Sequence, residues 1–174
     1  LPFSDLVALA QQSQPGARGV LFLPHLAGER SPYLDPDTRG AWVNLSLAHT
    51  QGDLIRAVLE GVAFSLRAAL EVIQDIAPVN QLLATGGGVR SPLWFHLLAD
   101  VLGTELVAPK AEEGAAYGAA ILAMVGVGAY PTLAAAFDML PEAIEAVQPQ
   151  QREAYEAAFE RYTPLYEALK AVRN

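Results

Sequence analysis

Between residues 82 and 92 the chain reads Leu82-Leu83-Ala84-Thr85-Gly86-Gly87-Gly88-Val89-Arg90-Ser91-Pro92. The apolar run at 81–85 predicts a strand, and the glycines after it interrupt any regular element. Ser91 is a favourable N-cap and Pro92 a favourable first helical residue, so a helix should begin there. It should end at Gly103, because glycine is preferred just past a helix C-terminus. The stretch therefore predicts a strand, a glycine turn and a capped helix in succession.

The glycine turn at 86–88 has two interpretations when the residues are considered alone. Glycines let main-chain N–H groups approach an anion, and the N-terminus of the following helix adds partial positive charge. Ser91 adds a hydroxyl that suits a phosphate or a ribose. The pattern lacks the Gly-Lys-Ser/Thr of a P-loop and the full Gly-x-Gly-x-x-Gly fingerprint. A nucleotide site and a tight turn without a ligand both stay open.

Downstream of this unit, the sequence predicts a strand at 105–109 and a helix of very small residues at 115–125. This helix would have a flat face formed by Gly114, Ala115, Gly118 and Ala119. An aromatic base can lie against such a face, but close packing of the helix on a sheet requires the same small residues. The acids before the helix, Glu112 and Glu113, are better explained by the helix dipole than as a catalytic pair.

The longest expected helix covers residues 50–77. Thr50 can cap it, Asp53 completes a capping box, and Pro78 ends it. Its apolar residues recur at helical spacing, which predicts a wide stripe that faces the core. This stripe consists of Leu54, Ile55, Val58, Leu59, Val62, Ala63, Leu66, Leu70 and Ile73.

Shorter elements complete the expected order. We expect helices at 4–13 and 133–140, strands at 20–23 and 41–45, and an irregular polar loop at 25–39. One helical face after Gln150 carries Tyr155, Phe159, Tyr162, Tyr166 and Leu169. Pro164 should kink or split that helix. Strands that alternate with helices predict an α/β fold, in which helices cover a sheet with parallel members.

The composition limits the class of protein. The 174 residues suffice for one domain with a core, and 52% are hydrophobic against 17% charged. A formal net charge of −8 argues against a nucleic-acid surface. The longest nearly apolar stretch, 115–130, is shorter than the about 20 residues that span a bilayer, which argues against a membrane protein.

Cysteine and histidine usage limits the chemistry. The chain has no cysteine, which excludes disulfides and thiolate metal sites and fits a cytoplasmic location. His25, His49 and His96 show no metal-ligand spacing, and we expect His96 at the surface. The N-terminus lacks an initiator methionine and a basic start, so we interpret it as a cut end and not as a signal peptide. The oligomeric state stays open, with a homodimer among the alternatives.

Considered together, several segments resemble one family, the FGGY carbohydrate kinases, and within it the xylulose kinases. Residues 21–32 and 35–40 are similar to the stretch Phe-Leu-Pro-Tyr-Leu-x-Gly-Glu-Arg-Thr-Pro followed by Asp-Pro-x-x-Arg-Gly. Three further segments are similar to motifs of this family. Residues 45–64 resemble its second signature, 85–93 its adenosine-binding glycine motif, and 113–120 the helix that follows that motif. The resemblance covers roughly 19–130, and the order and spacing of the motifs make it specific.

The resemblance implies an actin-like ATPase fold of the ribonuclease H type, with a mixed sheet flanked by helices. The chain 1–174 would be one C-terminal nucleotide-binding domain, with a core at about 19–130 and a C-terminal helical segment at about 132–172. ATP with Mg²⁺ is the implied cofactor. The implied contacts are Gly86, Gly87, Gly88 and Ser91 along the nucleotide, and Glu113, Gly114 and Ala115 beside the adenine pocket. Asn44 stands where the family usually has glycine, and Asn tolerates positive φ better than most residues.

By the same resemblance, the catalytic aspartate, the metal-associated acid and the β/γ-phosphate loops come earlier in a longer polypeptide. The chain would then be the ATP/ADP-binding part of a kinase that converts D-xylulose to xylulose 5-phosphate. The sugar would bind through a missing domain, and the chain alone should be inactive. The alternatives are an FGGY kinase for glycerol, gluconate or another sugar, or a non-catalytic actin-like interaction domain. A dinucleotide-binding oxidoreductase is disfavoured, because Glu105 is poorly placed to bind a ribose.

Overall fold

The computed structural model describes residues 2–109, 114–137 and 143–172. Its first elements are α1 (Phe3–Gln11), the 3₁₀ turn η1 (Ala17–Gly19), β1 (Leu21–Leu23), β2 (Ala41–Val43), α2 (Gln51–Gln74) and β3 (Gln81–Leu83). They are followed by the 3₁₀ turn η2 (Gly87–Arg90), α3 (Pro92–Leu102), β4 (Glu105–Pro109), α4 (Gly114–Gly126), α5 (Leu133–Phe137), β5 (Ala143–Val147), α6 (Arg152–Tyr162) and α7 (Leu165–Lys170). The expected α/β class is confirmed.

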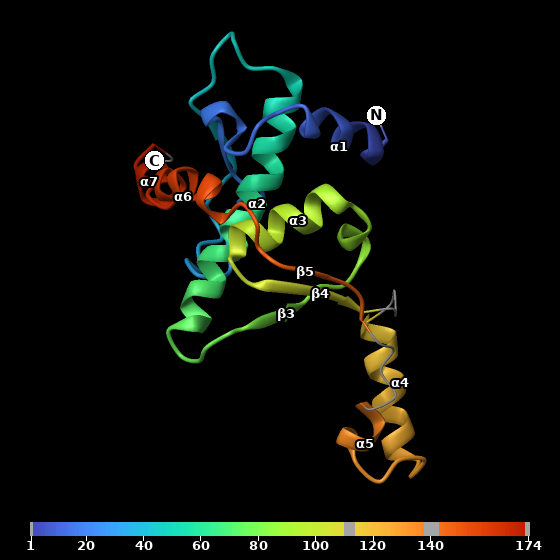
Figure 1. Cartoon of the computed structure of the whole chain (residues 1–174). Helices are drawn as coiled ribbons and strands as arrows, with labels where there is room; N and C mark the ends of the chain where they lie inside the picture. Colours follow the sequence, from blue (N-terminus) through green and yellow to red (C-terminus); the bar gives the residue numbers. More distant parts are fainter. Residues whose placement is uncertain (1, 110–113, 138–142, 173–174) are drawn as a thin grey trace.

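The strands form two small sheets. β1 pairs antiparallel with β2, with Leu21 opposite Val43. The other sheet has the order β3-β4-β5, in which β3 and β4 are parallel and β4 and β5 are antiparallel. It is therefore the mixed sheet that the sequence predicts. In Figure 1, α3 lies along this sheet between the sheet and the N-terminal half of α2, while α4 and α5 extend away from the end of the sheet.

Strand β5 corrects one expectation. A C-terminal helical segment is expected at about 132–172 with no strand within it, but Ala143–Val147 pairs with β4. Alanine and glutamate, which make up most of this segment, favour a helix when considered locally. Pairing with the free edge of β4 outweighs that preference, since strand formation depends on the available neighbour.

Helix α2 begins as expected, with a capping box between Thr50 and Asp53, and part of the predicted stripe, such as Leu70, is buried. Leu66 is 47% exposed and Ile73 is 54% exposed, so the predicted stripe is wrong at these positions. The residues of α2 that are buried are Gly52, Asp53, Arg56, Ala57, Glu60, Gly61, Ala63, Phe64, Arg67 and Leu70. The inward face is thus rich in charged and small residues.

The buried charges of α2 are compensated by partners. Arg56 Nε donates to Glu60 Oε1 at 2.8 Å, and the main-chain N–H of Gly16 donates to the same oxygen at 2.9 Å. Arg67 donates to both carboxylate oxygens of Glu156 on α6 and lies 4.0 Å from the ring centre of Phe159. Buried charges are tolerated when they are paired in this way, and hydrophobic spacing alone could not predict that these charged residues face inward.

The C-terminal helices close the main core as predicted. The buried aromatic residues on this face are Tyr155, Phe159, Tyr162 and Tyr166. The break falls at Pro164, between α6 and α7, because a proline removes a helical hydrogen bond. Phe64 of α2 contacts Phe159 and Tyr162, with ring centres 5.7 and 5.3 Å apart. These contacts fix the C-terminal segment against α2.

Gly61 lets α2 lie directly against β1. A Cβ atom at position 61 would overlap the main-chain carbonyl of Phe22 in β1. Gly118 in α4 is different, because a Cβ atom there meets no atom within 4 Å. The two glycines form a matched pair for testing this close approach.

We predict that Gly61→Ala lowers the free energy of unfolding by about 1–3 kcal/mol, because β1 must move to make room for the methyl group. Gly118→Ala should leave stability unchanged or raise it by up to about 1 kcal/mol, since alanine is the better helix former. Chemical denaturation of both variants measures the difference. Equal effects at the two positions would contradict the close approach of α2 to β1.

Candidate functional site

The glycine turn lies at the carboxyl edge of the parallel strand pair. Leu82 of β3 lies opposite Leu106 of β4, and Ala84 N donates to Val107 O at 2.9 Å just beyond β3. The turn at 86–88 follows β3, and α4 follows β4. Both segments therefore leave the sheet at the same edge (Figure 1). In α/β sheets this edge is where ligands bind.

The turn and the following helix have the conformations that the sequence predicts. Gly86 has φ 91° and ψ −177°, a combination that residues with a side chain rarely adopt. Ser91 caps α3, because its Oγ accepts a hydrogen bond from Trp94 N at 3.4 Å. α3 ends at Gly103, whose φ of 63° is left-handed. The unit is therefore a strand, a glycine turn and a capped helix.

The three glycines have different surroundings. A Cβ atom at Gly86 or Gly87 would meet no atom within 4 Å. A Cβ atom at Gly88 would lie 2.9 Å from the indole Nε1 of Trp94. The turn is thus open at Gly86 and Gly87 and closed at Gly88. Space for a ligand is present where the main chain is bare.

A pocket of about 360 Å³ lies beside this turn. Gly87, Arg90, Ser91 and Pro92 line one side of it, and Phe3, Ser4 and Val7 of α1 line the other. Its lining is mostly apolar and includes a glycine, two serines and an arginine beside apolar and aromatic residues. Such a lining suits a ligand with an anionic part and a flat apolar part. The contribution of α1 was not predicted, because no sequence spacing links residues so far apart.

The remaining predicted site residues are distributed differently. Gly114 begins α4, and Ala115 is exposed. Neither lines the pocket beside the glycine turn. Glu113 lies outside the described residues. The small-residue face of α4 does not pack closely, since a Cβ atom at Gly118 meets no atom within 4 Å. The structure therefore brings together Gly87 and Ser91, and it leaves Ala115 at the surface.

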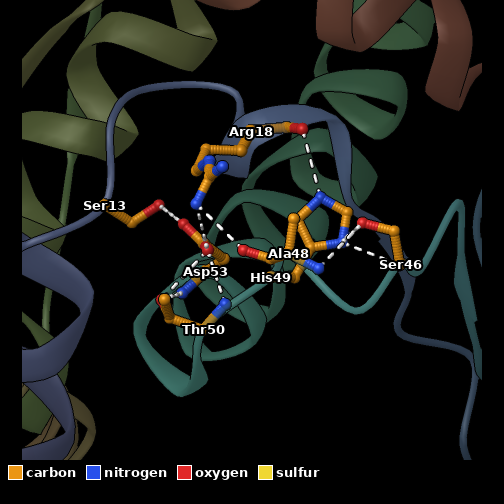
Figure 2. A network of polar contacts seen from close by, with 7 residues as sticks. All are labelled: Ser13, Arg18, Ser46, Ala48, His49, Thr50 and Asp53. Carbon is orange, nitrogen blue, oxygen red and sulfur yellow. Dashed lines mark hydrogen bonds and ion pairs between the residues drawn. The ribbon is translucent and has the colours of Figure 1, made fainter.

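A separate polar network joins the turn at 16–19 to the start of α2 (Figure 2). Residues 16–19 all have positive φ, from 46° to 96°. Asp53 Oδ1 accepts from Ser13 Oγ at 2.6 Å, and Oδ2 accepts from Thr50 N at 2.8 Å. Arg18 Nη1 lies 3.7 Å from Asp53 Oδ2. These contacts hold a strained turn against the helix N-terminus.

The outer part of the network ties the preceding loop to the same turn. Arg18 Nη1 donates to Ala48 O at 3.1 Å, and His49 Nδ1 accepts from Ser46 N at 2.9 Å. His49 Nε2 lies 3.3 Å from Arg18 O. Asn44 has φ 65°, as its residue type allows, and its Nδ2 donates to Gly19 O at 3.0 Å. Because these groups bind one another, we interpret the network as structural.

A second pocket, of about 380 Å³, lies near Arg56, Asp100 and Tyr155. Its charged groups also bind neighbours. Arg56 Nη2 donates to the Tyr155 hydroxyl at 2.7 Å, and Asp100 Oδ1 accepts from Gln150 N and Gln151 N. Burial raises the pKa of Tyr155 to about 12, so this hydroxyl stays protonated at neutral pH. The predicted site residues do not line this pocket.

The described residues contain neither a candidate metal site nor a candidate membrane-spanning helix. Over residues 2–109, 114–137 and 143–172, no group of three or more His, Cys, Asp or Glu side chains is placed to hold a metal ion. None of the helices in these ranges combines the length and apolar character needed to cross a bilayer. His96 is exposed, as predicted.

Comparison with known proteins establishes the family. Residues 3–127 match the model of the FGGY family of carbohydrate kinases, C-terminal domain. The chain is 35% identical over 168 residues to a xylulose kinase of Staphylococcus epidermidis, covering 96% of this chain and 34% of that protein. It is 37% identical over 141 residues to a gluconokinase of Bacillus subtilis, covering 80% of this chain and 28% of that protein. The chain belongs to the FGGY family of carbohydrate kinases and corresponds to its C-terminal domain.

Solved structures support the fold assignment. The ligand-bound xylulose kinase of Lactobacillus acidophilus matches with a TM-score of 0.87 and 30% identity, over 97% of this chain and 35% of that one. The gluconate kinase of the same organism matches with a TM-score of 0.81 and 30% identity, over 98% of this chain and 34% of that one. The predicted family and fold class are confirmed. Since relatives named for both substrates match, family membership does not fix the sugar.

The carboxylate of Asp53 gives a test of the network in Figure 2. Burial alone would raise its pKa, but hydrogen bonds from Ser13 and Thr50 and the charge of Arg18 lower the pKa below its ordinary value. A lowered folded-state pKa contributes stability above the unfolded pKa of about 3.9, and this contribution is lost as the pH falls through the folded value.

We therefore predict that Asp53→Asn lowers the free energy of unfolding by about 1–3 kcal/mol at pH 7, because charge-assisted hydrogen bonds are lost. The difference from the unmodified chain should shrink below about pH 4. Denaturation at several pH values measures it, with Asp37→Asn, an exposed position, as the control. A difference that is constant with pH would show that the charge of Asp53 is not what stabilises the fold.

Proposed function

We propose that this chain is the nucleotide-binding C-terminal part of an ATP-dependent sugar kinase, with D-xylulose as the favoured substrate and xylulose 5-phosphate as the product. Membership of the FGGY family supports this proposal. The observation that carries it is the open main chain at Gly86 and Gly87, beside a pocket with both polar and apolar walls. Adenine nucleotides present both kinds of surface to a protein.

The residues of the pocket suit the parts of ADP and ATP. Bare main chain at Gly87 in the lining, the N-terminus of α3 and the Arg90 side chain suit the phosphates, and Gly86, next to the lining, is equally open. Phe3 and Val7 of α1 offer apolar surface for the base. Ser91, which is mostly buried, carries a hydroxyl within the same lining. Nucleotide binding by these groups would hold the phosphates at the carboxyl edge of the sheet.

Phosphoryl transfer also requires a base for the sugar hydroxyl and a metal ion that neutralises the phosphates. The part of the chain that the structure describes offers no cluster of metal-ligating side chains. We propose that these groups, including the ligands of Mg²⁺, belong to the remainder of a longer kinase. The chain alone would then bind nucleotide without turning over a sugar. A cytoplasmic location fits this use of ATP.

The choice of sugar rests on similarity in the loop 25–39. Its Gly28-Glu29-Arg30-Ser31-Pro32 stretch resembles the xylulose kinases. In the structure Glu29 organises this loop, because it accepts from Arg30 N and Ser31 N and lies 3.0 Å from His25 Nε2. Gluconate is the second candidate, supported by the 37% identity to a gluconokinase.

Binding of ADP, measured by calorimetry, separates a kinase domain from a non-catalytic interaction domain. The unmodified chain should bind ADP. Gly87→Asp should weaken binding at least about tenfold, because a carboxylate at contact distance repels a phosphate by more than the about 1.4 kcal/mol that this requires. Gly126→Asp is the matched control, since it adds the same charge at a glycine that also has open surroundings. Equal heats for Gly87→Asp and the unmodified chain would reject the site.

A further inference from the structure

The glycine turn has one packed side and one open side. Gly88 faces the indole of Trp94, whose Nε1 and Cδ1 would lie 2.9 and 3.0 Å from a Cβ atom at position 88. Gly86 and Gly87 face open space. The indole therefore supports the turn at Gly88, and Trp94 does not line the pocket beside the turn.

Trp94 is itself firmly placed. It lies in the first turn of α3, is partly buried, and packs against the main core together with Val89. Its neighbour Phe95 is fully buried in that core. The main-chain N–H of Trp94 also donates to the capping hydroxyl of Ser91. Trp94 is thus held in place by its packing against the main core.

The turn has little means of holding its own shape. Glycine has no side chain with which to pack, and it loses more conformational freedom on ordering than any other residue. The path of residues 86–88 therefore depends on local main-chain hydrogen bonds and on contacts from other side chains. Two hydrogen bonds contribute, Val89 N to Gly86 O at 3.4 Å and Ser91 N to Gly88 O at 3.1 Å. The side chain that reaches Gly88 is Trp94.

We propose that Trp94 is a positioning residue for the nucleotide. It holds the turn in the path that presents the main chain of Gly86 and Gly87 to the phosphates, without touching the nucleotide itself. This inference rests on the proposed function, because it concerns the same pocket. A binding site that is held in shape before the ligand arrives costs less free energy to order, so loss of the indole should weaken binding.

A double-mutant cycle between Gly88 and Trp94 tests the inference, with ADP affinity measured by calorimetry for the unmodified chain, Gly88→Ala, Trp94→Leu and the double variant. Each single variant should bind ADP about tenfold more weakly, because the turn shifts in both. The double variant should bind no more weakly than Trp94→Leu, since a smaller side chain at 94 leaves room for the methyl group. Additive losses would instead show that the two residues do not act through their contact, which would contradict the inference.

Fluorescence gives a second measurement that does not depend on the Trp94→Leu variant folding. In a Trp42→Phe background, Trp94 is the only tryptophan left, because the chain has two. Both ADP and the Gly88→Ala substitution should then change its emission. If the unmodified chain does not bind ADP, the proposed function fails. If the unmodified chain binds ADP, two results would overturn the positioning role. One is that Trp94→Leu binds ADP with an affinity within twofold of the unmodified chain. The other is that Gly88→Ala leaves the emission of Trp94 unchanged.

Discussion

The parallel pairing of β3 with β4 is the constraint on which the candidate site depends. Because Leu82 lies opposite Leu106 in parallel register, the segments that follow the two strands emerge at one edge of the sheet. α3 connects the strands, and its N-terminus therefore points toward that edge as well. The glycine turn, the helix N-terminus and the pocket are consequences of this one alignment. An antiparallel pair would separate the segments after the two strands to opposite ends.

The interior supports the sheet through close main-chain contacts and paired charges as well as through apolar packing. Gly61 brings α2 directly against β1. Arg56 of α2 donates to the hydroxyl of Tyr155 on α6, and Arg67 of α2 donates to Glu156 on the same helix. Such pairs tie together elements that lie far apart in the sequence. They also place the outward apolar residues of α2, such as Leu66, at the surface of this chain.

The features that the sequence predicted are mostly local. The caps at Thr50 and Ser91 were identified because each depends on residues within one helical turn. The features that it missed depend on partners far along the chain. β5 forms because β4 has a free edge, and the buried arginines of α2, Arg56 and Arg67, have their distant partners on α6. Phe3 joins the candidate pocket only through the fold, so no local pattern could reveal it.

In the proposed complex, the bare main chain at Gly86 and Gly87 contacts the phosphates of an adenine nucleotide. The most direct test is a comparison of amide ¹H–¹⁵N spectra of the chain with and without ADP. The account predicts that the largest shifts occur at the amides of Gly86 and Gly87, with smaller ones along the first turn of α3. Unchanged glycine amides, or shifts confined to the pocket near Arg56 and Tyr155, would contradict it.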